Sequence, residues 1–244
     1  MKARNISLAL LALGACAAAA LAQGFWVKKE WRSWSKEECR KMQEDSPWAQ
    51  KWFRTHVAED RFGQPTKGDT RETEQQIFYV IQLRSALPVR QGFIRDLQFR
   101  NKYDKMSADQ KKNFDTSAEA FLARKYDDVI VVHVLYGSNV QNDEREMMRF
   151  WQTSYPEGTV PIEAFLSTGS GKRVAPIKYV AAKGAGLEFE LFFPRQMDGE
   201  PIITPDVKTI SVEFQHPNIG LEGTARVFQE FKTEKMIVNG AVVY

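Results

Sequence analysis

The sequence predicts an α+β fold in which N-terminal helices pack on a mainly antiparallel C-terminal β-sheet or small sandwich. In the first half of the chain, apolar residues recur at the spacing of amphipathic helices. From about Ile162 onward they alternate with polar residues, and this period of two continues to Tyr244. Helices and strands that are segregated along the chain are typical of α+β proteins.

The length of 244 residues allows one large domain or two small ones. We expect residues 1–22 to form a signal peptide, residues 23–160 a helical and mixed N-terminal region, and residues 161–244 an antiparallel β-rich region. The last two regions are expected to form one continuous domain, because the C-terminal sheet should pack on the helices and strands of the first.

The first 22 residues have the order of a secretory signal peptide. Lys2 and Arg4 precede an apolar run at 6–21, and small residues stand at Ala20 and Ala22. The run is about 16 residues long, below the roughly 20 that span a bilayer. We therefore expect cleavage after Ala22 and export, either to the periplasm or out of the cell.

A rival interpretation of the same segment is a lipoprotein signal. Residues 13–16 (LGAC) resemble a lipobox, in which Cys16 would be lipidated and become the first residue. Gly14 is not a favoured residue there, and 17–21 prolongs the apolar run instead of opening a polar tether. Cleavage after Ala22 is favoured, and the protein would be anchored to a membrane only if Cys16 is lipidated.

Charge and cysteine content narrow the classes of partner. Without the signal peptide, Lys plus Arg falls from 34 to 32 against 31 acidic residues, so the formal net charge falls from +3 to +1. This balance gives no case for a nucleic-acid partner or for an anionic membrane surface. Once Cys16 is removed or lipidated, Cys39 has no disulfide partner, and we interpret it as a small buried hydrophobic residue.

Helix signals dominate the start of the mature chain. Ser35 and Glu38 form a capping box that predicts a helix from there to about Asp45. Ser46 and Pro47 predict the start of another helix, as a cap followed by proline at its first position. The apolar face of this second helix would consist of Trp48, Ala49, Trp52, Phe53, His56 and Val57.

The middle of the chain mixes helices and strands. Residues 61–74 are polar, with glycine and proline, and are typical of a connection. Residues 76–83 predict a strand, and helices are predicted at about 92–103 and from a second capping box at 107–110. Residues 128–136 are apolar on both faces, which predicts a central strand that is covered on two sides.

The rest of the chain predicts one short helix and then antiparallel strands. Asn142 is the expected N-cap of the helix. Residues 173–182 and 187–193 are expected to form a hairpin, followed by a strand at 208–216. The dipeptide at 239–240, Asn-Gly, predicts a terminal hairpin with a type I′ turn.

Six short motifs are spread over nearly the whole mature chain: KEW at 29–31, WSKEE at 34–38, DSPWA at 45–49, FPR at 193–195, GEP at 199–201 and KMIVNG at 235–240. In these motifs the chain resembles a family of uncharacterised exported bacterial proteins of similar length. The resemblance implies export and a shared fold. It implies no activity.

The motifs of common catalytic and cofactor sites are not met. The segment 169–173 (GSGKR) differs from a Walker A motif, which needs glycine where Leu166 stands and Ser or Thr where Arg173 stands. Paired acids such as 127–128 are typical of helix starts and solvated faces, so no glycosidase pair is identified. The histidines are isolated and match no metalloprotease spacing; they are His56, His133 and His216. We expect no catalytic residue, metal or cofactor.

Five of the six tryptophans lie between Trp26 and Trp52. Flat aromatic side chains near acids can stack on sugar rings, and an exported protein meets glycans of the wall or capsule. Trp26, Trp31 and Trp34 are therefore candidate binding residues. Packing in the core is the favoured alternative for the cluster, because Trp48 and Trp52 share the spacing of core residues.

These observations predict an exported, non-catalytic binding or structural protein of the cell envelope or the secreted fraction. Its partner would be an unknown envelope component or glycan. The alternative is a hydrolase that acts on envelope glycan or related material. An enzyme needs a concave pocket with acids of perturbed pKa, whereas a binding protein needs only an exposed aromatic patch.

Overall fold

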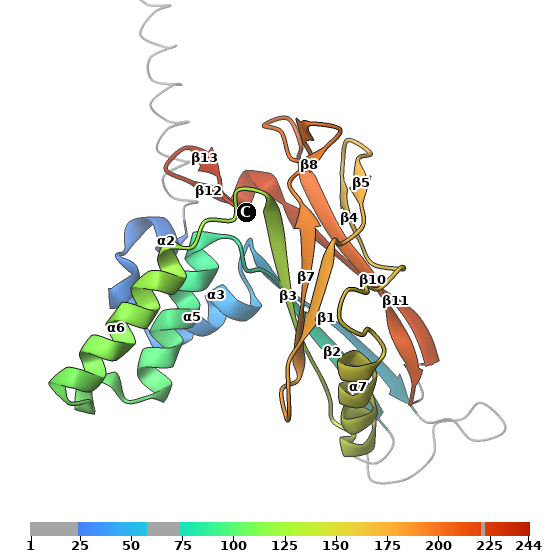
Figure 1. Cartoon of the computed structure of the whole chain (residues 1–244), viewed down its shortest axis with the longest axis horizontal. Helices are drawn as coiled ribbons and strands as arrows, with labels where there is room; N and C mark the ends of the chain where they lie inside the picture. The colour runs from blue at the N-terminus through green and yellow to red at the C-terminus, as the bar shows by residue number, and fades with distance from the viewer. Residues whose placement is uncertain (1–23, 58–73, 221–222) are drawn as a thin grey trace, which may run out of the picture.

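The computed structural model describes residues 24–57, 74–220 and 223–244. Their fold is α+β, as predicted, with N-terminal helices followed by a strand-rich C-terminal part (Figure 1). The predicted signal peptide, the lipidation alternative at Cys16 and most of the predicted connection at 61–74 lie outside the described residues. Among the described residues, no helix combines the length and the apolar character that crossing a membrane requires.

Five antiparallel strands form the larger sheet. Their order across it is β1 (Ala49–Val57), β2 (Glu74–Leu83), β3 (Val129–Ser138), β7 (Glu188–Pro194) and β6 (Lys178–Ala181). The central strand is β3, and side chains on both of its faces, such as Val131 and Val132, are buried. This burial matches the apolar pattern on both faces that predicted a central strand.

The smaller sheet has four antiparallel strands, in the order β11 (Gly223–Lys232), β10 (Thr209–Ile219), β4 (Phe165–Thr168) and β5 (Arg173–Val174). It packs on the larger sheet through aromatic rings. The ring centroid of Phe214 on β10 lies 5.1 Å from that of Tyr79 and 5.6 Å from that of Phe189. Helix α7 (Gln141–Thr153) adds Trp151, which stacks on Phe189 at 4.3 Å.

The helical layer lies to one side of the sheets, at the left in Figure 1. It contains α2 (Phe25–Lys28), η1 (Trp31–Ser33), α3 (Lys36–Glu44), α5 (Leu87–Arg100), η2 (Tyr103–Lys105) and α6 (Ala108–Ala123). Both predicted capping boxes are present, at the starts of α3 and α6. Helices α3 and α5 approach closely at Gly92, where the absence of a side chain leaves room. A Cβ at this position would lie only 2.8 Å from Cγ of Met42.

Two short antiparallel strand pairs and one 3-10 turn complete the fold. They are β8 (Gln196–Met197) with β9 (Glu200–Pro201), the turn η3 (Thr233–Lys235), and β12 (Ile237–Val238) with β13 (Ala241–Val242). Asn239 and Gly240 have φ values of 51° and 81° between β12 and β13. Two positive φ values in a two-residue loop are those of the predicted type I′ turn.

The prediction of a helix over Ser46 to Val57 is wrong, because this segment forms a tight turn and then β1. Backbone hydrogen bonds join Ser46 and Ala49 across the turn, and β1 pairs with β2 along its whole length. A segment of about ten residues fits both helical and alternating patterns. Here the aromatic and β-branched content of β1 and its pairing with β2 decide the outcome.

Three smaller boundaries also differ from the sequence prediction. Helix α5 begins at Leu87 instead of 92, because Pro88 is tolerated in the first turn of a helix, where no backbone N–H is needed. Helix α7 begins after Val140, so Asn142 lies inside its first turn and is not the cap. The predicted hairpin is formed by β6 and β7, whereas the residues of β5 pair with β4 in the smaller sheet.

Candidate functional site

A cavity of about 470 Å³ lies where three distant parts of the chain meet. Trp26 and Trp31 line it from the N-terminal segment, Leu87 and Gln91 from the start of α5, and Asn239 from the turn between β12 and β13. We call it the tryptophan cavity. Both tryptophan side chains are half-buried, so each ring presents part of its surface to the cavity.

The indole ring of Trp26 is held by neighbouring rings and by the backbone. It packs edge to face against Phe25 at 5.2 Å and against Trp48 at 5.4 Å, measured between ring centroids. Gly24 lies directly against the same ring, and a Cβ added at Gly24 would be 2.3 Å from it. These contacts fix the orientation of the ring before any ligand binds.

Trp31 is positioned by a single turn of 3-10 helix. The carboxylate of Glu30 accepts a 2.8 Å hydrogen bond from the backbone N–H of Arg32 and thereby caps this turn. The guanidinium of Arg32 lies 4.5 Å from the ring centroid of Trp31. The cation stabilises the ring from one side by a cation–π contact.

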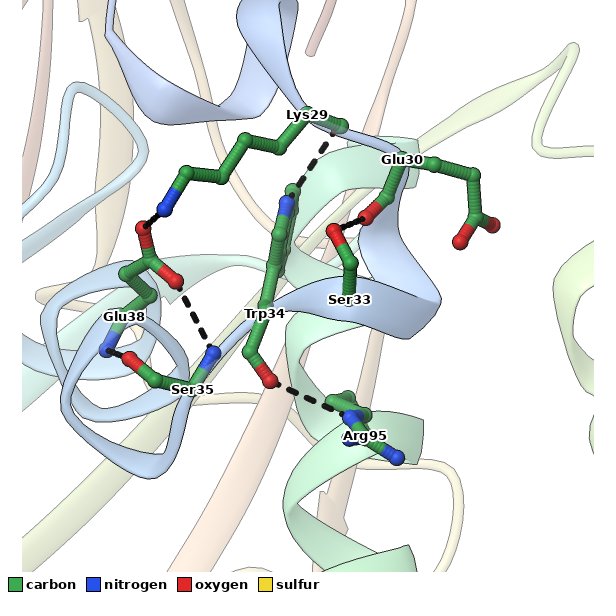
Figure 2. A network of polar contacts seen from close by, with 7 residues as sticks. All are labelled: Lys29, Glu30, Ser33, Trp34, Ser35, Glu38 and Arg95. Carbon is green, nitrogen blue, oxygen red and sulfur yellow. Dashed lines mark hydrogen bonds and ion pairs between the residues drawn. The ribbon is translucent and has the colours of Figure 1, made fainter.

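Trp34 does not belong to the cavity. Its side chain is 1% exposed and forms part of the core. As Figure 2 shows, its indole N–H donates to the carbonyl of Lys29 at 3.4 Å, and its own carbonyl accepts from Nε of Arg95 at 3.1 Å. The structure thus brings two of the three expected binding tryptophans together and uses the third to fasten their segment to α5.

A second tie fastens the same segment to α3. Lys29 Nζ forms an ion pair with Glu38 Oε1 at 2.5 Å (Figure 2). Glu38 is also the capping-box residue that accepts from the backbone N–H of Ser35 at 2.9 Å. The hydrogen bond from Lys29, followed by that from Ser35, lowers the pKa of the Glu38 carboxyl below its usual value. The carboxylate therefore remains ionised and keeps both contacts at neutral pH.

The third wall comes from the C-terminal hairpin. Nε1 of Trp48 donates a 2.6 Å hydrogen bond to the carbonyl of Val243, and the N–H of Val243 donates to the carbonyl of Met236 at 3.0 Å. Trp48 is fully buried and also supports the Trp26 ring. The two walls of the cavity are therefore coupled through one tryptophan.

The composition of the tryptophan cavity suits a saccharide. Aromatic rings pack on the C–H faces of sugar rings, and amides supply both a donor and an acceptor for hydroxyl groups. Gln91 and Asn239 carry such amides. Sequence reasoning missed these two residues and Leu87, because they reach Trp26 only through tertiary contacts and no local pattern connects them.

A second cluster of polar side chains lies on the outer face of the larger sheet. His133 is 4% exposed, with Nε2 3.4 Å from Glu188 Oε2 and Nδ1 3.5 Å from Glu190 Oε1. Contact with His133 is the main cause that lowers the pKa of Glu188. Burial alone would raise the pKa of Glu190, but His133 and Arg84 together lower it.

These lowered pKa values bear on the hydrolase alternative. A glycosidase needs one carboxyl group with a raised pKa to act as general acid. Glu188 and Glu190 are both driven toward the ionised form. The cluster is therefore suited to joining β3 and β7 through polar contacts, and it does not have the acid and base of a glycosidase.

The histidines are placed on three different strands. His56 lies on β1, His133 on β3 and His216 on β10. His216 is fully buried, and its Nδ1 is 2.7 Å from the hydroxyl of Tyr79. Within the described ranges, no group of three or more His, Cys, Asp and Glu side chains is arranged to hold a metal ion.

No protein-family model, curated protein or solved structure matches this chain.

Proposed function

We propose that this protein is an exported, non-catalytic binding protein of the cell envelope, and that it binds a glycan in the tryptophan cavity. The observation that carries the proposal is the convergence of Trp26 and Trp31 on one cavity that Gln91 and Asn239 also line. Half-buried aromatic rings can pack on the C–H groups of a sugar ring, and neighbouring hydrogen-bonding groups can contact its hydroxyl groups.

The rigidity of the cavity supports a binding role. Trp26 is fixed by Gly24, Phe25 and Trp48, and the segment that carries Trp31 is tied to α3 and α5. A site whose side chains are already ordered loses little conformational entropy when the ligand binds. Glu30 is the one carboxylate among the described residues that line the cavity, whereas glycoside hydrolysis generally uses two.

Binding is tested with the mature protein and a panel of oligosaccharides in titration calorimetry. We expect the Trp31→Ala variant to weaken binding about tenfold, since an aromatic contact is worth about 1.4 kcal/mol. Phe53→Ala is the matched control, because Phe53 is an exposed aromatic residue on β1 that does not line the cavity. Equal affinity in Trp31→Ala, Phe53→Ala and the parent protein would refute the proposed site.

The hydrolase alternative predicts a different result from the same panel. A hydrolase would release reducing ends over time, and the release would be lost in Glu30→Gln if Glu30 were catalytic. We expect the oligosaccharides to be recovered intact after incubation with the protein. Turnover above that of a boiled sample would overturn the non-catalytic part of the proposal.

Export is tested separately by the mass of the native protein. Cleavage after Ala22 gives a mature chain that begins at Gln23. We expect this chain, without modification, in the exported fraction. A diacylglyceryl group on Cys16 would instead establish a membrane-anchored protein, and a full-length chain inside the cell would contradict export.

A further inference from the structure

A second cavity of about 520 Å³ adjoins the tryptophan cavity, and Leu87 and Val243 line both. Four cationic side chains line the second cavity, and we call it the cationic cavity: they are Arg90, Arg124, Lys125 and Arg195. Asp127 is the one acidic side chain among its described lining residues. The two cavities are therefore neighbours that share a pair of apolar lining residues.

Arg90 is the deepest of these cations, with a side chain that is 6% exposed. Its Nη1 donates to the carbonyls of Phe121 at 3.0 Å, Leu122 at 2.8 Å and Arg124 at 2.9 Å. These carbonyls lie at the C-terminal end of α6, which carries the negative end of the helix dipole. Arg90 offsets that end, so the positive surplus of the cavity comes from the other cations.

Arg195 makes its hydrogen bonds with backbone oxygens. Its Nε donates to the carbonyls of Tyr126 at 2.6 Å and Val129 at 3.1 Å, and its Nη2 donates to the backbone oxygen of Tyr244. Its guanidinium also lies 4.2 Å from the ring centroid of Tyr244. These contacts orient the guanidinium of Arg195.

Arg124 and Lys125 are exposed at the mouth of the cationic cavity. Within the described part of the chain, none of the four cations lies within ion-pair distance of a side-chain carboxylate, unlike Lys29 or Arg100. Cations that converge on a concave surface raise the local concentration of anions and bind carboxylate or phosphate groups by charge-assisted hydrogen bonds.

We propose that the ligand is an acidic saccharide that occupies both cavities. A sugar ring lies against Trp26 and Trp31, and a carboxylate or phosphate group of the same ligand lies beside the exposed cations Arg124 and Lys125. This inference rests on the proposed function and adds the charge of the ligand to it. Each cavity falls within the range of roughly 300–1,000 Å³ that holds a small ligand, so together they fit a short oligosaccharide.

The test compares trigalacturonate with its methyl ester, which has the same sugar rings without the charge. We expect the parent protein to bind the acid about tenfold more tightly than the ester at low salt, a difference of about 1.4 kcal/mol. The double variant Arg124→Gln/Lys125→Gln should bind both equally. The control Lys105→Gln/Lys112→Gln removes the same charge from exposed positions outside the cationic cavity and should keep the preference.

The outcomes separate this inference from the proposed function. If the ester binds as tightly as the acid, and Trp31→Ala weakens both, the ligand is a neutral glycan and only the inference fails. If neither saccharide nor a neutral panel binds, the proposed function fails. If triglutamate binds as tightly as trigalacturonate, the cationic cavity acts without the sugar, and the inference fails.

Two further arms complete the design. A phosphorylated maltotriose replaces trigalacturonate to compare phosphate with carboxylate, and tighter binding of either than of neutral maltotriose supports the inference. Thermal melts of each variant confirm that it is folded. For a variant that does not fold, Lys125→Gln alone replaces the double change, and an unchanged preference for the acid in that variant counts against the inference.

Discussion

The indole N–H of Trp48 donates a 2.6 Å hydrogen bond to the backbone carbonyl of Val243, across 195 positions of sequence. Trp48 stands immediately before β1, and Val243 follows β13. This bond joins the first strand of the larger sheet to the C-terminal hairpin. It also holds Val243, which lines both the tryptophan cavity and the cationic cavity, in place.

Deleting residues 241–244 is therefore expected to destabilise the protein. The deletion removes β13, leaves the buried Trp48 N–H without its acceptor, and removes the Tyr244 side chain that packs on Arg195. An unsatisfied buried donor costs about 1–3 kcal/mol, and lost apolar burial adds about 25 cal/mol per Å². We expect a loss of several kcal/mol in urea unfolding, out of a typical 5–15.

Gly240→Val provides a milder test of the same hairpin. Gly240 has a φ of 81°, which a β-branched residue adopts only with strain, but the substitution leaves the Trp48 bond possible. We expect a smaller loss of stability in urea unfolding than in the deletion.

The deletion also has an outcome that would contradict the role of the hairpin. A deletion variant that melts within about a degree or two of the parent protein would show that the hairpin does not support the fold, since ~1 kcal/mol shifts the melting temperature by a few degrees.

Much of this fold could be predicted from the sequence, because the patterns that indicate it are local. Two capping boxes, an Asn-Gly turn and the alternation in β7 and β10 each specify geometry within a few residues. The segment 48–57 was misread because its outcome depends on pairing with β2, which follows a long connection. Its aromatic residues satisfied the helical period and the strand period alike.

The candidate site was predictable only in part. Trp26 and Trp31 could be proposed as binding residues, since aromatic residues and acids lie close together in the sequence. The burial of Trp34 could not be predicted, because it depends on tertiary packing of this segment against α5. The contributions of Gln91 and Asn239 depend on the packing of three distant segments.

Cys39 is expected to be chemically inert in the folded protein. Cys39 lies on α3 and is fully buried, and burial raises the pKa of its thiol to about 12. The reactive thiolate is therefore scarce at neutral pH, and the reagent has no access. We expect no reaction with a thiol reagent in native buffer and one equivalent in urea. Rapid labelling of the native protein at pH 8 would contradict the burial of this residue.

His133 is expected to be a stabilising residue without a catalytic or metal-binding role. Replacement of His133 by Ala leaves Glu188 and Glu190 without their shared partner. It also leaves a cavity where the imidazole was packed beside β3. We expect a loss of roughly 1–3 kcal/mol in urea unfolding, without a change in saccharide binding. Lys183→Ala, at an exposed site between β6 and β7, is the control and should change stability little.

Metal analysis completes the test of His133. We expect the purified parent protein to contain no stoichiometric metal, as the isolated histidines of the sequence predict. The same analysis is made on His56→Ala, His133→Ala and His216→Ala. About one zinc per chain, lost in any of these variants, would contradict the structural role assigned to the histidines.

His216 is expected to make stability depend on pH in the mildly acidic range. The imidazole is fully buried against Tyr79, and burial lowers its pKa from 6.5 to about 4. Between these values the unfolded chain binds a proton that the folded chain does not. The free energy of unfolding therefore rises with pH across this window, and the stability due to neutral His216 is fully present above 6.5.

As the pH falls from 6.5 to about 4, this contribution is lost, and the interval corresponds to roughly 3 kcal/mol. Urea unfolding is measured at steps of pH for the parent protein and for His216→Gln, which keeps a polar side chain but does not titrate. We expect the two stability curves to converge toward pH 4, because only the parent has a side chain that takes up a proton in the unfolded chain and not in the folded chain across this window. Since His216→Gln also changes the contact with Tyr79, the slopes are compared and not the absolute values. Parallel curves across this window would show that His216 titrates normally and is not buried as described.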